Sequence, residues 1–462
     1  MRPSGTPNRG QLKLGVILDG AGSTADGWRR PEIKPDASVD IGGYIDQARR
    51  AEQARLDFIF IADSLFITHD SAPHQLNRLE PLTLLSAVAG ATSRVGLVAT
   101  VSTLFAEPFT VARQLASLDL ISQGRCAWNI VTSAVPAAAL NHSRPVEFAN
   151  NDRYKRAEEH VAACLALWDS WEDDAFVYDK ASGTYFDRAK LHLQNFKGDY
   201  YQVTGPLNIQ RSKQGRPVLF QAGASEQGRN LAARYGDAIF AMTSNMTAAK
   251  AYADDVRARA AHFGRQPDDI VFMPRISPII GEDQNEVDTL YHQATRLADI
   301  EDAIRTMGIF FGNHDFSSYD LDGPFPDFDV ATAPATDHRP DRDPLAYVET
   351  STPESFAAAA RQRDLSLRSA ALEFFTPRTE FVGTPDEVAA AAERWFHAHA
   401  ADGFIIRGGD FDRFSALCIP ILQRRGLFRT DYEAETLRGN LGLRPAENRH
   451  TAERRRREES HA

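Results

Sequence analysis

Residues 93–133 combine two apolar, strand-like runs with one helix between them, and this pattern constrains the fold more than any other stretch. The first run covers residues 94–101. The helix after it begins at Pro108 and ends near Gly124, because proline favours the first helical turn and glycine the position just beyond the last. The second run, residues 126–131, completes a strand–helix–strand unit. Two buried strands joined by a helix indicate a parallel β/α fold.

Small hydroxylated residues follow both apolar runs. Thr100, Ser102 and Thr103 lie at the end of the first run, and Thr132 and Ser133 follow the second. In parallel β/α folds the carboxyl ends of the strands meet at one face, where ligands bind. Such hydroxyls also end strands and cap helices without binding a ligand, and for a single pair this structural explanation is favoured.

The same alternation continues along the chain and predicts eight strands. They are expected near residues 12–18, 57–63, 94–101, 126–131, 217–222, 237–242, 270–280 and 403–407. Helices are expected near residues 43–55, 81–93, 108–124, 152–171, 247–263, 283–307, 385–399 and 411–425. Eight units favour an α/β fold of the closed (β/α)8 TIM-barrel type over an open, doubly wound sheet. No glycine-rich dinucleotide or P-loop motif follows a predicted strand, so those folds lose support.

Two long segments interrupt the alternation. Residues 172–216 are rich in Gly, Asp, Tyr and Asn and have hairpin character, and residues 312–348 are dense in Pro, Asp and Gly. We interpret both as insertions near 172–216 and 312–348 within a single domain of residues 1–450, because a linker would need independent domains on both sides. The charged residues 451–462 are predicted to form a disordered tail.

Composition narrows the class of protein further. The chain has 462 residues and a formal net charge of -11, which argues against a nucleic-acid or acidic-membrane binder. Its three cysteines are far apart without a C-x-x-C motif, so neither a disulfide framework nor a metal site is indicated. No apolar run reaches the roughly 18 residues of a membrane span, and the polar start lacks a signal-peptide core. These features predict a soluble, cytoplasmic protein.

Two polar residues beside predicted strands are candidate ligands. Asp63 ends the apolar run 57–63 and should lie at the same face as Thr100. Ser225 follows the run 217–222 at the start of a helix, whose free amides and dipole favour phosphate. Helix capping alone also explains a serine at that position.

Many longer motifs carry a family resemblance. They include GAGSTADGWRRP, DFIFIADS, LEPLTLLSAVA, SRVGLVATVST, EPFTVARQLASLDLISQGRCAWNIVTS, RYKRAEEHV, GPLNIQRSKQGRPVLFQAGASEQGR, VGTPDEVAA and ADGFIIRGGDF. In these motifs the chain resembles the bacterial-luciferase-like FMN-dependent monooxygenases, specifically the nitrilotriacetate and dibenzothiophene-sulfone monooxygenase group. The resemblance covers nearly the whole chain.

The resemblance implies a chemistry and a set of partners. It implies a flavoprotein oxidoreductase with a barrel fold, which uses FMN in its reduced form, FMNH2, as a substrate and O2 as a co-substrate. A separate NAD(P)H-dependent flavin reductase would supply the reduced flavin in a two-component system. The enzyme would oxygenate or oxidatively cleave a small organic substrate and assemble as a homodimer or homotetramer.

The resemblance also implies roles for individual residues. Asp63 and Thr100 correspond to positions near the isoalloxazine, and Tyr154 and Ser225 to positions that hold the phosphate end. Asn150 is a further cofactor-binding candidate and stands where the family commonly has a histidine. An amide can hydrogen-bond but cannot carry charge or transfer a proton as an imidazole does.

The loop after Ser133 departs from the family pattern and is expected to line the substrate side. Trp28, Phe66 and His142 are candidates for the substrate pocket, although core or surface packing is the favoured explanation for each of them. His142 is also a candidate to replace the missing imidazole. The chemistry relies on flavin and oxygen, and no catalytic side chain is assigned.

Two alternative functions stay open at the level of sequence. One is a deazaflavin-dependent oxidoreductase of the same superfamily, which needs no oxygen. The other is a non-catalytic flavin-binding protein, which Asn150 and the departing loop keep open. Cofactor selectivity and oxygen-dependent turnover would separate the three.

Overall fold

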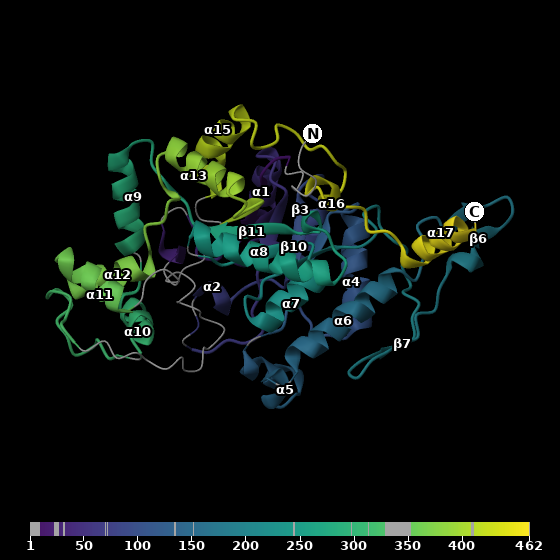
Figure 1. Cartoon of the computed structure of the whole chain (residues 1–462), viewed down its shortest axis with the longest axis horizontal. Helices are drawn as coiled ribbons and strands as arrows, with labels where there is room; N and C mark the ends of the chain where they lie inside the picture. Colours follow the sequence, from purple (N-terminus) through teal and green to yellow (C-terminus); the bar gives the residue numbers. More distant parts are fainter. Residues whose placement is uncertain are drawn as a thin grey trace.

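Eight parallel strands form a closed barrel at the centre of the molecule (Figure 1). The computed structural model describes residues 10–22, 27–30, 33–69, 71, 73–133, 135–150, 152–243, 245–296, 298–312, 314–328, 353–407 and 411–461. The strands are β1 (Lys13–Ile17), β2 (Phe58–Ile61), β3 (Gly96–Ser102), β4 (Cys126–Val131), β9 (Val218–Gln221), β10 (Ala238–Ala241), β11 (Val271–Ile276) and β14 (Gly403–Arg407). Their order around the barrel is β1-β14-β11-β10-β9-β4-β3-β2. The predicted α/β barrel is confirmed; seven of its strands lie within the predicted stretches, and β3 extends one residue beyond its stretch, to Ser102.

Helices cover the outside of the barrel. They are α1 (Ile41–Gln53), α3 (Pro81–Ala89), α4 (Pro108–Ile121), α6 (Arg153–Trp168), α7 (Glu226–Tyr235), α8 (Met246–His262), α13 (Pro385–His397), α14 (Phe411–Arg413) and α15 (Ile419–Arg424). A π-helical turn, Phe414–Cys418, connects the last two. Short elements after the strands are η1 (Gly27–Arg29), α2 (Pro73–Leu76), η2 (Pro136–His142) and α5 (Glu147–Asn150).

Alternate strand residues fill the interior of the barrel with apolar side chains. Phe58 and Phe220 meet edge to face with ring centroids 4.9 Å apart, and Val98 and Ile405 belong to the same buried cluster. Gly15 is required beside them, because a Cβ there would lie 2.2 Å from the ring of Phe58. The barrel is therefore a packed core whose ligand face is its open carboxyl end.

Aspartates at the starts of three strands tie neighbouring strands together at the amino end of the barrel. Asp57 Oδ2 accepts the N–H of Leu14 at 2.7 Å, and Asp237 Oδ2 accepts the N–H of Leu219 at 2.9 Å. Asp402 Oδ2 accepts the N–H of Phe272, in β11, at 2.7 Å. Each carboxylate thus satisfies a strand amide that the ladder leaves open.

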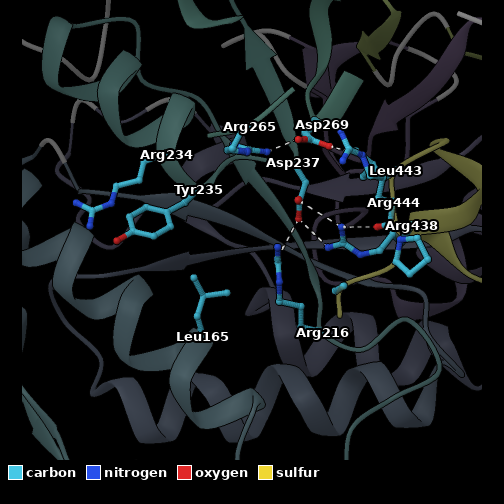
Figure 2. A pocket seen from close by; sticks show the side chains of 12 residues that line it. Leu165, Arg216, Arg234, Tyr235, Asp237, Arg265, Asp269, Arg438, Leu443 and Arg444 are labelled. Atoms are coloured by element: carbon cyan, nitrogen blue, oxygen red, sulfur yellow. Dashed lines mark hydrogen bonds and ion pairs between the residues drawn. The ribbon is translucent and has the colours of Figure 1, made fainter. Parts of the chain in front are cut away.

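Arginines pair with these aspartates, as Figure 2 shows for one of them. Asp237 accepts bonds from Arg216 at 3.1 Å and from Arg438 at 2.8 Å. Burial alone would raise the pKa of Asp237, but these guanidiniums hold it below its usual range. Arg438 belongs to α16 (Leu437–Asn440), whose Leu437 packs into the interior cluster. The carboxyl-terminal segment therefore closes the amino end of the barrel.

A helical insertion leaves the barrel after β11. It contains α9 (Gln284–Arg296), α10 (Ile300–Phe310), α11 (Pro353–Gln362) and α12 (Leu367–Phe375), which lie together on the left of Figure 1. Its two ends pair as parallel strands, β12 (Ile279–Ile280) with β13 (Val382–Gly383). A separate aromatic cluster around Phe311, Phe316 and Phe325 stabilises it.

The sequence prediction differs from the structure in this insertion. The single helix predicted over 283–307 is wrong, because Asp299 accepts the N–H of Asp302 at 2.8 Å and begins a second helix there. The predicted long strand 270–280 is likewise divided into β11 and the short β12 outside the barrel. Of the predicted insertion 312–348, residues 313 and 329–348 lie outside the described residues.

Two antiparallel hairpins lie between α6 and β9, within residues 172–216. They pair β5 (Phe176–Asp179) with β6 (Thr184–Phe186), and β7 (Phe196–Lys197) with β8 (Gln202–Val203). At this end of the molecule (Figure 1), α17 (Arg449–His461) contacts the same segment, since His450 stacks on His192 with ring centroids 3.7 Å apart. Within the described part of the chain, no helix has the length and apolar character needed to cross a membrane.

The predicted disorder of residues 451–462 is wrong for residues 451–461, which belong to α17. Glu172, only 2% exposed, accepts bonds from Arg454 at 2.8 and 2.6 Å and from the Thr451 hydroxyl at 3.0 Å. A bidentate arginine–carboxylate contact of this kind orders a helix whose own composition is too polar to predict it.

Candidate active site

Polar side chains gather at the carboxyl ends of β3 and β4. Thr100 and Asn129 are directly paired residues of these strands, and Asn129 Nδ2 donates to Thr100 Oγ1 at 3.0 Å. Both side chains are more than nine-tenths buried. Their position follows from strand alternation, because Val98 and Ala127, two residues earlier on each strand, face the barrel interior.

Asp63 follows β2, the neighbour of β3, and lies in a partly buried position. Burial raises the pKa of its carboxyl from 3.8 to about 6, although the N–H of Ser64 and the charge of Arg78 oppose this shift. A carboxyl with such a pKa changes its charge near neutral pH, which is a common property of functional sites.

Tyr154 and Ser225 meet at the first turns of two different helices. Ser225 Oγ donates to Tyr154 Oη at 2.9 Å and accepts the N–H of Gly228 at 3.2 Å, which makes it the N-cap of α7. The guanidinium of Arg153 lies over the ring of Tyr154, 5.1 Å from its centroid. Two hydroxyls, a helix amino terminus and a nearby cation form a seat suited to phosphate.

Buried polar atoms at the carboxyl ends of β4, β9 and β10 have hydrogen-bonding capacity that a polar ligand could use. Asn129 Oδ1, Gln221 Oε1 and Thr243 Oγ1 are buried and have no hydrogen-bond partner among the described residues. Gly223 forms a cradle, because a Cβ there would lie 2.6 Å from Gln221 Nε2 and 3.4 Å from Tyr154 Oη. A flavin, with a polar ring edge and a phosphate, fits this set of donors and acceptors.

The other predicted site residues are Asn150, Trp28, Phe66 and His142, and they lie in the segments that follow the barrel strands. Asn150 ends α5, four residues before Tyr154, and its side chain lies outside the described part of the structure. Trp28 is in η1 and is 41% exposed. The segment that carries Phe66 lies next to the end of η2, which carries His142, since Asn141 Nδ2 donates to the carbonyl of Leu65 at 2.9 Å. Their substrate-binding role stays a prediction.

His142 packs against a neighbouring ring. It stacks on Phe105 with ring centroids 4.5 Å apart and an interplanar angle of 6°. Phe105 lies in the loop that follows β3, so the stack is next to the strand that carries Thr100. This contact accounts for an imidazole at that position without a proton-transfer role.

Sequence reasoning missed four charged or polar residues at the barrel mouth. They are Asp19, Asn129, Arg275 and Arg407. Each lies within or just after a predicted apolar strand, in the runs LKLGVILD, CAWNIV, FMPRI and GFIIR. A polar residue at the carboxyl end of a strand is the signal that could have identified them.

Comparisons with known proteins agree with this geometry. Residues 24–402 match the family model for luciferase-like monooxygenases. The chain is 39% identical to N-acetyl-S-(2-succino)cysteine monooxygenase of Bacillus subtilis (strain 168), over 96% of this chain and 99% of the relative. It is 36% identical to nitrilotriacetate monooxygenase component A of Aminobacter aminovorans, over 94% of this chain and 96% of the relative. The solved structure of an EDTA monooxygenase from Chelativorans sp. BNC1 superposes with a TM-score of 0.76 at 32% identity. The superposition covers 94% of this chain and 99% of that structure.

The closed barrel, the polar residues at its carboxyl end and these similarities define the class of protein as a monooxygenase with a (β/α)8-barrel fold. The chain belongs to the luciferase-like monooxygenase family. The predicted resemblance is therefore confirmed, and the protein is a monooxygenase.

Proposed function

We propose that the carboxyl-end mouth of the barrel binds reduced FMN and that the protein is the oxygenase component of a two-component system. A separate NAD(P)H-dependent flavin reductase supplies the reduced flavin, and O2 is the co-substrate. The name of the relative from Aminobacter aminovorans, "component A", supports a second component. When bound, reduced flavin supplies the electrons that activate molecular oxygen for transfer to the organic substrate.

The phosphate seat at Tyr154 and Ser225 is the observation that carries this proposal. Helix geometry leaves the amides of the first turn of α7 without intrahelical acceptors, and the helix dipole adds positive potential there. The Tyr154 hydroxyl, the Ser225 hydroxyl and the charge of Arg153 complete the seat. This seat therefore favours FMN, which ends in a phosphate, over riboflavin, which lacks one.

The remaining mouth residues orient the flavin ring and exclude water from it. The Asn129 amide and the Thr100 hydroxyl offer polar contacts at the barrel wall, and Asp63 offers a carboxyl whose charge changes near pH 6. The rings of Phe60 and Phe240 stack with centroids 5.4 Å apart. Phe60 belongs to the apolar cluster that fills the barrel, and Phe240 packs against it. An apolar floor keeps water away from the reacting atoms.

Location and assembly complete the proposal. We expect a cytoplasmic protein that assembles as a homodimer or homotetramer, as the family resemblance implies.

The test compares reduced FMN with reduced riboflavin, which lacks the phosphate, in anaerobic titrations. Tyr154→Phe removes one hydroxyl from the seat and is expected to weaken FMN binding by about tenfold, the usual effect of losing a bond to a charged group. Riboflavin binding should stay unchanged. Tyr178→Phe, on the exposed hairpin where Tyr178 donates to Gln210 at 2.6 Å, is the matched control.

Two results would contradict the assignment of the seat. One is equal binding of FMN and riboflavin by the unmodified protein. The other is an equal loss of both ligands in Tyr154→Phe. Ser225→Ala is a weaker probe, because it also removes the N-cap of α7 and costs about 1 kcal/mol of stability.

A further inference from the structure

A cavity of about 210 Å³ lies at the amino end of the barrel, opposite the proposed flavin site (Figure 2). One water molecule occupies about 30 Å³ in the liquid, so the cavity has room for a polyatomic ion. Its lining comes mainly from the end of α7, from the segments that precede β9, β10 and β11, and from α16 with the residues after it. The charged residues of the lining are Arg216, Arg234, Asp237, Arg265, Asp269, Arg438 and Arg444.

Three arginines of this cavity share two carboxylates. Asp237 accepts bonds from Arg216 at 3.1 Å and from Arg438 at 2.8 Å. The second carboxylate, Asp269, belongs to η4 (Pro267–Asp269) and pairs with Arg444 at 2.9 Å. These pairs join α16 and the residue shortly after it to the segments that precede β9, β10 and β11.

Arg265 adds a fourth positive charge to the cavity. Within the described part of the chain its side chain donates only to backbone carbonyls. These are the carbonyls of Ala233 and Gly236 at the end of α7, at 3.0 and 2.7 Å, and that of Asp269 at 2.9 Å. The Arg265 charge therefore has no hydrogen-bonded carboxylate to balance it.

Two neighbouring carboxylates are already paired with other arginines. Glu158 pairs at 3.2 Å with Arg234, the fifth arginine of the lining. Asp169, whose charge acts on Arg216, pairs with Arg211. Setting these pairs aside, the lining holds four arginines and two aspartates, and therefore two more positive than negative charges. An anion in the cavity would relieve the repulsion among the guanidiniums.

Both arginines that bind Asp237 keep N–H groups that this carboxylate does not use. Arg438 donates to it through its two Nη atoms, and Arg438 Nε is buried without a hydrogen-bond partner among the described residues. Arg438 is only 4% exposed, so bulk water does not replace that partner. Arg216 donates only through Nη1, to Asp237 and to the carbonyl of Pro217, which leaves its Nε and Nη2 without a partner in the described structure. An oxyanion would satisfy these donors.

We propose that this cavity binds a phosphate group, either as inorganic phosphate or as part of a larger molecule. A phosphate group carries about two negative charges near neutral pH, which matches the two unbalanced positive charges of the lining. Guanidinium groups bind phosphate through paired, charge-assisted hydrogen bonds. The bound anion joins α16 to the segments before β9 and β11, and so stabilises the closed amino end of the barrel without taking part in the oxygen chemistry.

Calorimetric titration of the full chain with inorganic phosphate tests the site, with chloride at equal ionic strength as the reference. The unmodified protein is expected to bind phosphate at least tenfold more tightly than chloride. Arg216→Gln and Arg444→Gln should each weaken phosphate binding by about tenfold, because each removes a charged donor. The Arg444 side chain is 61% exposed, and its ion pair measures 2.9 Å. Arg394→Gln, on α13, is the matched control, since Arg394 is 55% exposed and pairs with Glu380 at 2.9 Å.

Further measurements keep the two ends of the barrel apart. Thermal unfolding checks that each variant folds, and Arg444→Gln, at an exposed side chain, carries the test if Arg216→Gln does not fold. The proposed flavin seat also accepts phosphate, so the titration is repeated on Tyr154→Phe, which should keep the amino-end site. Glycerol phosphate is titrated in parallel: tighter binding than inorganic phosphate identifies a larger ligand, and weaker binding identifies the free ion.

Three results would overturn the inference. The first is equal binding of phosphate and chloride by the unmodified protein. The second is a loss of phosphate binding confined to Tyr154→Phe, which would place the ion at the mouth. The third is an equal loss in Arg444→Gln and Arg394→Gln. None of these titrations contains flavin, so a failure of the amino-end site and a failure of the proposed function are distinguishable.

Discussion

Asp63 combines a position at the barrel mouth with a carboxyl that resists ionisation. Burial is the main cause, and it raises the pKa of Asp63 from 3.8 to about 6. Between about pH 4 and pH 6 the native state binds more protons at this residue than the unfolded state does. The contribution of Asp63 to the free energy of unfolding is therefore largest below pH 4 and is lost as the pH rises through 6.

Asp63→Asn should remove this dependence. We expect the variant to be more stable than the unmodified protein at pH 7, by about 1–2 kcal/mol, and to lose that advantage at pH 4. Urea denaturation at both pH values measures the difference. Asp46→Asn, at an exposed position of α1, is the control and should follow the unmodified protein. A stability difference for Asp63→Asn that does not change with pH would contradict the pKa assignment.

Individual site residues differ in how far the sequence could predict them. The strand-end position of Thr100 follows from the apolar run before it, and capping of α7 by Ser225 follows from the strand-to-helix change. The contact between Tyr154 and Ser225 joins residues 71 positions apart, which local pattern cannot show. Arg275 and Arg407 were missed because their approach depends on the register of β11 with β14, and register is set by the closed barrel.

Helix α17 shows how one tertiary contact decides the state of a whole element. Its composition is highly charged and offers no apolar face, so the sequence alone predicts disorder. Glu172 reverses that expectation by accepting two bonds from Arg454 and one from Thr451. The Arg454 hydrogen bonds are the main reason why the pKa of Glu172 falls to about 2. The contact is therefore intact at neutral pH and is lost only as the pH falls toward 2.

Glu172→Gln should release α17 from the hairpin while leaving the barrel folded. Glutamine keeps the size of the side chain but loses the charge that the guanidinium needs. Hydrogen exchange of backbone amides in residues 449–461 is expected to accelerate about tenfold or more, with α1 unchanged. Glu453→Gln, at an exposed position on α17 itself, is the matched control. Unchanged protection of α17 in Glu172→Gln would show that other contacts hold the helix.

The barrel as a whole separates stability from function along its axis. Its amino end is closed by buried ion pairs, Arg429 with Asp57 and Arg438 with Asp237, together with Leu437 of α16. Its carboxyl end carries the Tyr154–Ser225 contact, which we propose as the phosphate seat, on one side and Arg275 and Arg407 on another. This division explains why strand–helix alternation predicts the fold well, whereas the ligand chemistry depends on single residues at the strand ends.

The central claim concerns this carboxyl end, and anaerobic titration of the full chain with reduced FMN, oxidised FMN and a deazaflavin tests it most directly. Each titration is followed by rapid mixing with oxygenated buffer. We predict selective binding of reduced FMN, and oxidation of the bound flavin that is clearly slower than in free solution, because the mouth shields it from water. Selective binding of the deazaflavin, or oxidation of bound FMN at the rate of free FMN, would contradict the claim.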